Sequence, residues 1–403
     1  MALTAQQLLY LNVLMNSDAL CTGDFQSVGD LAADDLANLA ADAGKERVIL
    51  ENILADEQLK GMRIVDILCE DWGAGYGVFA DGDAEAVVAF RGTTTGEEWY
   101  DNFAAANQAD GAHQIAAREY LEGLDLSGYE TVTVTGHSKG GNKAMYCAVL
   151  CEEVDRCVSF DGQGFSDEFM IKYGDRIRLR QGRIENHCAG GDYINILLNG
   201  IGNSFYYETF NSSGNFFLNH ELTAMCDEEG LMHPGEQEPG VLKLDAFGNS
   251  YLRSLSDSRK ASTLDLLGKA AALILKGDTA VAGAGDLLAL MNQRRYRKDL
   301  TELFAYIIQY ERKTGGLIDG LREITQNAEI GDLFRGIGNR LLDLLAWQAN
   351  NPAAIWGIAS GINLLIENRE WSYMLGLISE AAWRAGSVKI DPASGADIRI
   401  AFA

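Results

Sequence analysis

The segment from residue 131 to residue 145 constrains the fold more than any other part of the chain, because it predicts a strand, a forced turn and a helix in succession. The alternating β-branched side chains of residues 131–135 favour a strand. Residues 136–140 then read Gly-His-Ser-Lys-Gly, which matches the G-x-S-x-G pattern that presents a serine on a strained turn between strand and helix. Glycines around Ser138 let the helix pack close to the strand. The alternative interpretation is a glycine-rich turn in which Ser138 faces solvent.

The length and charge of the chain limit the class of protein that it can be. With 403 residues it is long enough for a substantial core and for two domains. Its formal net charge of −25 argues against nucleic acid as a partner and against docking on anionic lipid headgroups, since both need a basic surface. Residues 1–15 lack a basic region and a signal-cleavage pattern, and no run of 18 apolar residues occurs. We therefore expect a cytoplasmic protein without stable membrane insertion.

The seven cysteines are odd in number and scattered, and they form no C-x-x-C pair. This distribution predicts reduced, mostly buried thiols rather than disulfides or a zinc site. The sequence also lacks a D-x-D-x-D-G loop for calcium. We expect neither a metal nor any other cofactor.

Strand-like segments alternate with helical ones before about residue 255. Helices are predicted over residues 3–57 and 112–124, and residues 75–90 read as two strands joined by a turn at Asp81-Gly82. Further short apolar strands are predicted at residues 62–68, 156–160, 183–188 and 205–210. Strands that alternate with helices imply an α/β fold, with a largely parallel sheet covered by helices on both faces.

The pattern changes after about residue 255. Apolar residues at helical spacing recur at residues 264–275, 287–291, 300–310, 333–347 and 355–366. Pro352 suits a helix start, and residues 387–402 suggest a short hairpin. We therefore expect residues 1–254 to form the sheet-containing domain with a helical N-terminal segment, and residues 255–403 to form a mainly helical domain.

Ser138 can act as a nucleophile only with a histidine base and an acid that orients the base, because a serine hydroxyl is weakly nucleophilic near neutral pH. In folds with this turn the chain order is serine, acid, histidine. Three of the five histidines do not fit that order and setting, namely His113, His137 and His187. His220 follows the last predicted strand in a loop, where the base is expected, whereas His233 precedes a proline in a polar loop. We favour His220 as the base and keep His233 as the alternative.

Two aspartates compete as the acid. Asp192 follows the second strand after that of Ser138, and Asp161 follows the first. Both stand at the carboxyl end of a predicted strand, where the functional loops of open α/β sheets gather. Asp192 matches the commoner position and is favoured, while Asp161 remains the alternative or stabilises a glycine-rich turn.

A serine nucleophile also needs two preorganised donors for the oxyanion that forms on the attacked carbonyl. The backbone N–H of Lys139, directly after Ser138, is the first candidate. The second is Thr93, in the loop that follows the strand ending at Phe90, through its N–H and its hydroxyl. The alternative for that loop is a polar strand end without such a role.

Together these motifs resemble those of the class 3 (fungal-type) lipases, and most of all a bacterial, largely uncharacterised branch whose turn reads G-H-S-K-G-G-N. The resemblance covers about residues 60–225, and it rests on Val-Val-Ala-Phe-Arg-Gly-Thr at 87–93, Trp99, Gly-His-Ser-Lys-Gly-Gly at 136–141 and Ser-Phe-Asp-Gly-Gln-Gly at 159–164. It implies an α/β-hydrolase fold and hydrolysis of carboxylic esters. The residues that it implies are the nucleophile Ser138, the acid Asp192, the base His220 and the oxyanion donors Thr93 and Lys139.

Three positions depart from that family's usual residues. Lys139 stands where many such lipases carry leucine, and it places a cation beside the nucleophile. Asn102 is found where the motif after Trp99 usually has aspartate, and Gln163 replaces an expected proline. In the bacterial branch the acid is often not aspartate, so the choice of Asp192 rests partly on this chain's own pattern.

We therefore expect a serine esterase or lipase that cleaves an acyl ester or lipid through an acyl-enzyme on Ser138. The alternative is a catalytically silent hydrolase scaffold whose helical C-terminal domain binds a protein partner. A third hypothesis keeps the serine chemistry but directs it to thioesters or acyl transfer.

Overall fold

The structure is a computed structural model. It describes residues 2–17, 19–40, 43–70, 74–92, 108–213, 216–275, 289–290, 293–327, 331–351, 377 and 380–385. The chain divides into two compact units, with the main boundary between Val241 and Leu242. The first unit contains the sheet, and the second is helical.

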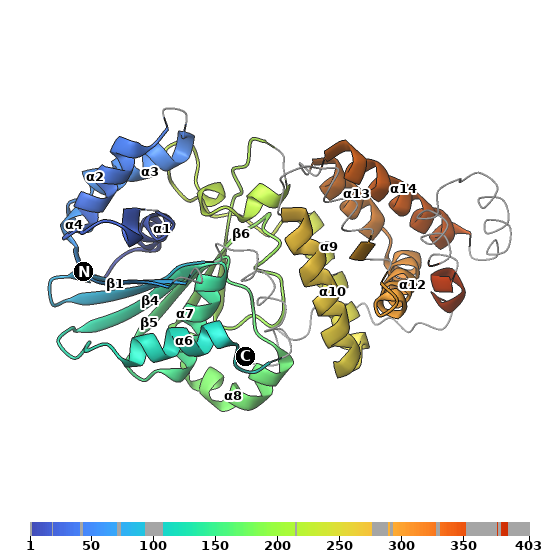
Figure 1. The fold of residues 1–403 in the computed structure, drawn as a ribbon, viewed down its shortest axis with the longest axis horizontal. Coiled ribbons are helices and arrows are strands. Elements are labelled where there is room, and N and C mark those ends of the chain that lie inside the picture. Colours follow the sequence, from blue (N-terminus) through green and yellow to red (C-terminus); the bar gives the residue numbers. More distant parts are fainter. Residues whose placement is uncertain are drawn as a thin grey trace. The chain divides into compact units, whose positions relative to one another are not determined.

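The described residues of the first unit form a seven-stranded sheet whose strands lie in chain order from β1 to β7 (Figure 1). The strands are β1 (Arg63–Cys69), β2 (Gly75–Asp81), β3 (Glu85–Phe90), β4 (Thr131–His137), β5 (Arg156–Phe160), β6 (Ile184–Ala189) and β7 (Asn203–Tyr207). The β1–β2 and β2–β3 pairs are antiparallel, whereas each pair from β3 to β7 is parallel. The mostly parallel sheet expected from the sequence is confirmed, although β7 begins and ends earlier than the strand expected at residues 205–210.

The helices of the first unit precede the sheet or connect its strands. They are α1 (Ala5–Leu14), α2 (Val28–Asn38), α3 (Gly44–Ala55), α4 (Glu57–Gly61), α6 (Ala112–Glu122), α7 (Lys139–Leu150) and α8 (Asp167–Arg180). Side-chain caps set where four of them begin, because each cap accepts a backbone N–H of the first helical turn; the caps are Thr4, Ser27, Asp56 and Ser166.

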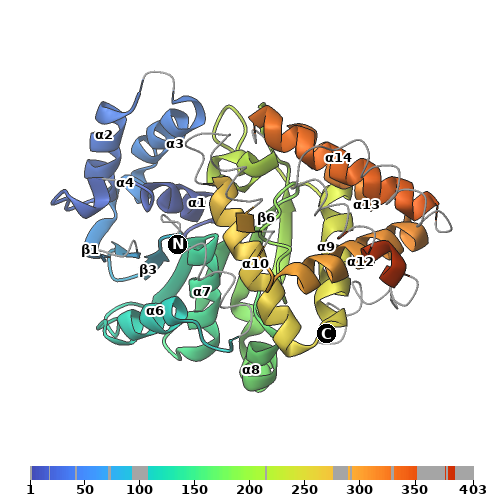
Figure 2. The ribbon, with the colours of Figure 1, turned by 45° about the vertical axis from the view of Figure 1, so that its right-hand side comes forward.

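Helices cover both faces of the sheet, and the pattern within β3 shows how. Val87 and Ala89 pack into a core shared with α1 to α4, whereas Ala86, Val88 and Phe90 pack into a second core shared with α6 to α8. Successive strand residues point to opposite faces, so a strand that is buried on both sides is apolar throughout. Figure 2 shows α1 to α4 on one side of the strands and α6 and α7 on the other.

The second unit consists of helices with a separate core. Its described helices include α9 (Pro239–Ser254), which starts just before the boundary, and α10 (Asp257–Leu275), α12 (Arg297–Thr314), α13 (Leu317–Asn327) and α14 (Gly331–Asn350). Tyr251, Phe304 and Leu345 are among its buried side chains. The helical character predicted for this region is confirmed. Pro352, the helix expected at residues 355–366 and the hairpin expected at residues 387–402 lie outside the described residues.

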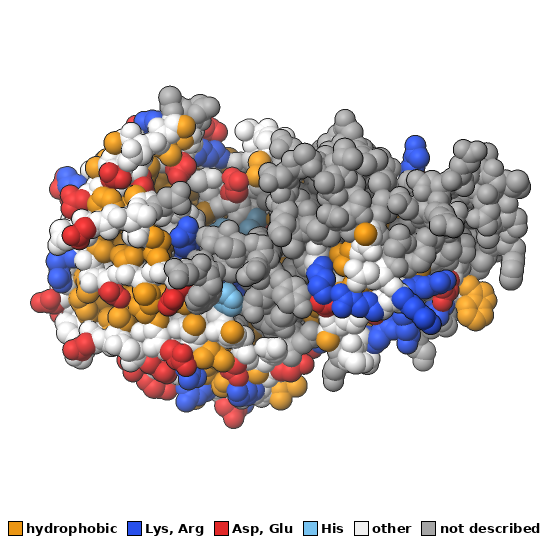
Figure 3. Space-filling model, in the orientation of Figure 1, with side chains coloured by type: hydrophobic (Ala, Val, Ile, Leu, Met, Phe, Trp, Pro, Cys, Tyr) orange, Lys and Arg blue, Asp and Glu red, His pale blue; other side chains and the backbone are white. Residues whose placement is uncertain are grey.

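The surface of the first unit is strongly acidic in places, in keeping with the net charge of −25. Figure 3 shows acidic side chains gathered over α6 and α8, with some basic and apolar ones between them. Within the described ranges, no helix combines the length and hydropathy that are needed to cross a bilayer.

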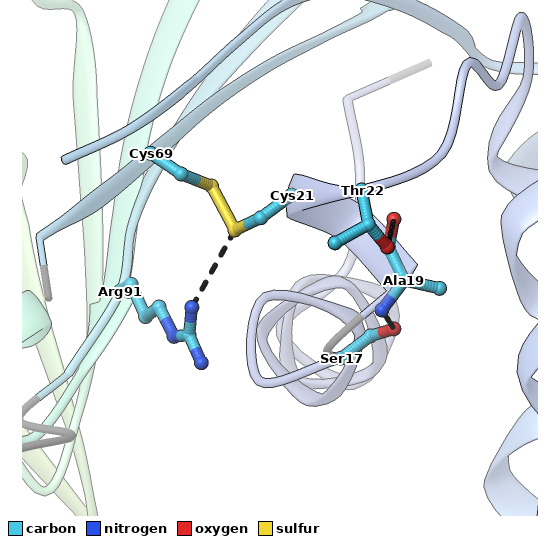
Figure 4. The surroundings of a disulfide bond; sticks show 6 residues. All are labelled: Ser17, Ala19, Cys21, Thr22, Cys69 and Arg91. Carbon is cyan, nitrogen blue, oxygen red and sulfur yellow. Dashed lines mark hydrogen bonds between the residues drawn. A yellow bond between two sulfur atoms is a disulfide. The ribbon is translucent and has the colours of Figure 1, made fainter. Parts of the chain in front are cut away.

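One cysteine pair contradicts the expectation of reduced thiols throughout. Cys21, at the end of a short 3₁₀ helix (Ala19–Cys21), forms a disulfide with Cys69, the last residue of β1 (Figure 4). A guanidinium N–H of Arg91 lies 3.6 Å from the Cys21 sulfur. The other five cysteines are buried free thiols, as expected. The prediction failed for Cys21 and Cys69 because residues 48 apart are brought together by packing, which their spacing does not reveal.

Candidate active site

Ser138 occupies the turn between β4 and α7. Strand β4 ends at His137 and α7 begins at Lys139, so one residue makes the change of direction. The backbone of Ser138 has φ 58° and ψ −122°, which is a strained conformation for a residue with a side chain. A hydrogen bond from its N–H to the carbonyl of Phe160, 2.9 Å long, ties the turn to the end of β5.

The glycines around Ser138 are required by close backbone contacts. A Cβ on Gly136 would lie 2.2 Å from the carbonyl carbon of Gly140. A Cβ on Gly140 would lie 2.0 Å from the carbonyl oxygen of Phe90 in β3, nearer than such atoms approach in real structures. Any side chain at these positions would push α7 away from the sheet and displace Ser138.

His220 lies next to the Ser138 hydroxyl. Its Nε2 is 2.8 Å from the Ser138 Oγ, and its Nδ1 is 2.8 Å from the Asp192 Oδ1. The carboxylate beside Nδ1 favours the tautomer with the proton on Nδ1, which leaves Nε2 to accept the serine proton. His220 is the last residue of a short 3₁₀ helix (Phe216–His220) rather than part of an irregular loop.

Asp192 is fully buried just after β6. Its Oδ2 accepts the backbone N–H groups of Ile194 at 3.1 Å and Asn195 at 2.7 Å, while its Oδ1 faces His220. Three donors around one carboxylate fix its orientation and stabilise its charge where water has no access.

Asp161, the alternative acid, lies close by but does not contact the imidazole of His220. It is fully buried at the end of β5, and its φ of 45° is unusual for a residue with a side chain. Its Oδ1 accepts the N–H of Ala189 at 2.8 Å and the amide of Asn195 at 2.9 Å. Burial, together with the neighbouring charge of Asp192, raises the pKa of Asp161 well above its usual range.

His137 packs against the ring of His220, a contact that the sequence analysis missed. The two ring centroids lie 4.8 Å apart, with 30° between the ring planes. Burial, and next the charge of His220, hold the pKa of His137 well below its ordinary value, so the ring stays neutral beside His220. The position of His137 directly before Ser138 could have predicted this contact, because a turn this tight brings both sequence neighbours of the serine close to the histidine base.

Two of the remaining histidines, His187 and His233, lie in separate networks. His187, within β6, pairs with the Tyr207 hydroxyl at 2.8 Å and with Glu185 at 3.2 Å. His233, the alternative base, lies 2.6 Å from Asp227 and is exposed at the surface. The geometry therefore brings together Ser138, Asp192 and His220, and leaves His187 and His233 elsewhere.

Of the two expected oxyanion donors, the structure describes one. Lys139 is the first residue of α7, and the first N–H groups of a helix are not used by the helix's own hydrogen-bond ladder. Its side chain is buried rather than extended into solvent. Thr93 lies outside the described residues, as do Trp99 and Asn102, so the second donor stays a prediction.

Lys143 and Asn142, one turn into α7, hold the surrounding loops. The Lys143 ammonium donates to the carbonyl of Arg91 at 3.1 Å, which fixes the chain just after β3. The Asn142 amide donates to the carbonyls of Gln163 and Gly164 at 3.1 Å each. These bonds anchor the segments that follow β3 and β5 on either side of Ser138. In the described part of the chain, no group of three or more His, Cys, Asp or Glu side chains is arranged to hold a metal ion.

Comparisons with known proteins find similarity to lipase-like proteins over part of this chain. A family model described as Mbeg1-like matches residues 73–198, a range that includes Ser138 and Asp192 but not His220. Extracellular phospholipase A1 of Serratia liquefaciens is 28% identical over 125 residues, which are 30% of this chain and 38% of the phospholipase. A solved structure titled M37 lipase aligns with 49% of this chain and 71% of its own, at 14% identity and a TM-score of 0.32. The chain thus matches well under half of the curated relative's length.

Proposed function

We propose that this protein is a serine hydrolase that cleaves carboxylic esters through an acyl-enzyme on Ser138. The observation that carries the proposal is the unbroken pair of 2.8 Å contacts from the Ser138 hydroxyl to His220 and from His220 to Asp192. A serine, a histidine and a buried carboxylate in this order form the arrangement that activates a hydroxyl for attack on a carbonyl. The lipase-like similarities support the same reaction class.

In the first half of the reaction, the Ser138 oxygen attacks the ester carbonyl while His220 Nε2 takes the hydroxyl proton. Asp192 keeps the imidazole in the productive tautomer and stabilises the positive charge that forms on it. The tetrahedral oxyanion is stabilised by the Lys139 N–H, at the positive end of the α7 dipole, and by the proposed second donor, Thr93. When the intermediate collapses, His220 returns the proton to the leaving alcohol, and the acyl group stays on Ser138.

The second half reverses these roles with water. His220 removes a proton from a water molecule that attacks the acyl-enzyme carbonyl, and the new tetrahedral intermediate again uses the oxyanion donors. Collapse breaks the bond to the Ser138 oxygen, which recovers its proton from His220. The products are a carboxylic acid and the alcohol, and the enzyme returns to its starting state.

For the substrate, we propose an acyl ester of a lipid. The support comes from the curated relative, whose title says that it is an extracellular phospholipase A1, and the match covers a minority of both chains. The formal net charge of −25 argues against docking on anionic lipid headgroups. A protein partner that binds the helical C-terminal region remains part of the alternative, in which the hydrolase fold is silent.

Localisation is a separate question. The sequence analysis expected the cytoplasm, but the Cys21–Cys69 disulfide is typical of an oxidising compartment. The similarity to an extracellular enzyme supports the same direction. We therefore propose that the protein works outside the reducing cytoplasm.

The test is hydrolysis of p-nitrophenyl esters of increasing acyl length by the wild type, Ser138→Ala and Ser212→Ala. Ser212 is an exposed serine in the first unit and serves as the matched control. We expect the wild type and Ser212→Ala to be active, and Ser138→Ala to lose several orders of magnitude in kcat with an unchanged circular dichroism spectrum. Folded wild-type protein that hydrolyses no ester in the series would favour the silent scaffold.

A further inference from the structure

A second buried carboxyl, that of Asp161, follows the strand next to the one that precedes Asp192. Asp161 directly follows β5 and Asp192 comes shortly after the neighbouring strand β6, and both residues are 0% exposed. The two carboxyl groups share Asn195, whose backbone nitrogen lies 2.7 Å from the Asp192 Oδ2 and whose side-chain amide nitrogen lies 2.9 Å from the Asp161 Oδ1. Two carboxylates this close in a site without water cannot both be ionised at modest cost, so one of them must hold a proton.

The hydrogen-bond donors around the pair are distributed unevenly. Asp192 accepts from His220, Ile194 and Asn195, and both of its oxygens are used. Asp161 receives its two donors on Oδ1, and its Oδ2 has no hydrogen-bond partner among the described donors. N–H donors stabilise the ionised form of a carboxyl group, so Asp192 is the better anion of the two. A proton on the Asp161 Oδ2 turns an unsatisfied buried oxygen into a donor.

We propose that Asp161 is a positioning residue for the Ser138–His220–Asp192 relay: it keeps a proton at neutral pH and donates a hydrogen bond from its Oδ2 to the Asp192 carboxylate. The effect of Asp161 on ester hydrolysis rests on the proposed function. Because Asp161 holds a proton, the pair carries a single negative charge, and this charge stabilises the imidazolium that forms on His220. Asp161 thereby adds a further hydrogen bond that holds the Asp192 carboxylate in place.

Asn195 links the two carboxyl groups and makes their relative position specific. Its backbone N–H donates to Asp192, and its side-chain amide donates to Asp161 and to the carbonyl of Ala189. The backbone N–H of Asp161 donates to the carbonyl of His187 in β6. The donors that Asp161 receives from β6 and the loop after it are therefore amide groups, and Asp192 is the titratable neighbour that affects it.

The proton can be detected without measuring activity. A carboxyl that is protonated in the folded state but ionised in the unfolded chain makes the unfolding equilibrium constant rise about tenfold per pH unit above the ordinary pKa of aspartate. Asp161→Asn removes this dependence, and asparagine suits both the positive φ and the acceptor role of Oδ1. Urea unfolding of both proteins should show the wild type losing stability relative to Asp161→Asn by about 100-fold in equilibrium constant between pH 5 and pH 7. A constant ratio over that range would overturn the proposal, whether or not the protein hydrolyses esters.

Two variants at position 161 separate hydrogen-bond donation to Asp192 from the packing of the side chain. The Asp161→Asn amide can still donate to Asp192, whereas Asp161→Ala cannot. We expect Asp161→Ala to lower kcat about 10- to 100-fold, as for a lost hydrogen bond to a charged group, and Asp161→Asn to restore most of that loss. An equal loss of kcat in both variants would contradict the proposed hydrogen bond from residue 161. A loss in Asp161→Asn as large as that in Asp192→Asn would mean that Asp161 is ionised in the wild type, which would also contradict the proposal.

A substrate-free measurement keeps this part independent of the proposed function. The proton between His220 Nδ1 and Asp192 should give a downfield ¹H resonance in the wild type and in Asp161→Asn, and this resonance should shift or disappear in Asp161→Ala. An unchanged resonance in folded Asp161→Ala would refute the positioning role even if no ester substrate had been found.

Discussion

Replacement of Gly140 by alanine tests how the nucleophile is positioned. Gly140 is the second residue of α7, and a Cβ there would lie 2.0 Å from the carbonyl oxygen of Phe90. Contacts under 3.0 Å between such atoms are essentially not observed, so the start of α7 and β3 must separate by about 1 Å. Because Ser138 directly precedes α7, the shift would lengthen its 2.8 Å contact with His220 beyond hydrogen-bond distance.

The expected effect has two parts. A misplacement of about 1 Å at the reacting group costs about 100-fold in kcat/KM. Overpacking at a tight backbone contact lowers the free energy of unfolding by about 1–3 kcal/mol. Both are measurable on one preparation, by ester hydrolysis and by urea unfolding.

Gly174→Ala provides the matched control. Gly174 lies inside α8, and the nearest atom to its added Cβ is the Arg178 guanidinium at 3.8 Å. Glycine in a helix interior is less favourable than alanine by about 1 kcal/mol, so this variant should be slightly more stable and fully active. If Gly140→Ala behaved like Gly174→Ala in both assays, the close contact of α7 with β3 would not position the serine, and the reasoning would be refuted.

Three further predictions follow from the hydrogen bonds and cysteines. Asp192→Asn should lower kcat about 10⁴-fold without unfolding the protein, because the amide presents the wrong partner to His220; turnover near that of the wild type would remove Asp192 as the acid. Hydrogen bonding to His187, and then to Arg156, lowers the pKa of Glu185 to about 2. The ionised Glu185 therefore stabilises the folded state fully above the unfolded pKa near 4.5, and this stabilisation is lost as the pH falls from there towards 2. Since Glu185 is about one-third exposed, we expect Glu185→Gln to cost about 1–2 kcal/mol at pH 7 and progressively less below pH 4.5, as measured by urea unfolding; a difference independent of pH would contradict the assignment. Peptide mapping without reductant should recover Cys21 linked to Cys69 in protein secreted by its host, and recovery of both as free thiols would support a reducing compartment.

The features that could be predicted from the sequence are those set by local patterns. Residues 86–90 of β3 and 131–135 of β4 are apolar or β-branched, which is typical of strands between two helical layers. The spacing of Gly136, Ser138 and Gly140 predicts the strained turn, because only glycine allows the observed contacts on either side of the serine. The order of serine, acid and histidine along a parallel sheet favoured Asp192 and His220 but left Asp161 and His233 as alternatives, since the carboxyl ends of parallel strands meet at one edge.

The features that could not be predicted depend on contacts between distant segments. The Cys21–Cys69 pair forms because a 3₁₀ helix packs beside β1, and nothing in the spacing of the cysteines reveals that contact. Asp161 and Asp192 looked like competitors for one role, since only the fold shows that adjacent strands bring both carboxyl groups together. The packing of His137 against His220 likewise depends on the backbone path through Ser138, which the sequence implies but does not specify.

The central claim, that Ser138 is an activated nucleophile, is tested most directly by reaction with a fluorophosphonate probe. Such a reagent forms a covalent bond to the oxygen of an activated serine and releases fluoride, so it reports activation without any assumption about the natural ester. We predict one adduct per chain in the wild type, located on Ser138 by peptide mass spectrometry, and no adduct in Ser138→Ala or His220→Ala. Folded wild-type protein that remains unmodified, or that carries the adduct on another serine, would contradict the account.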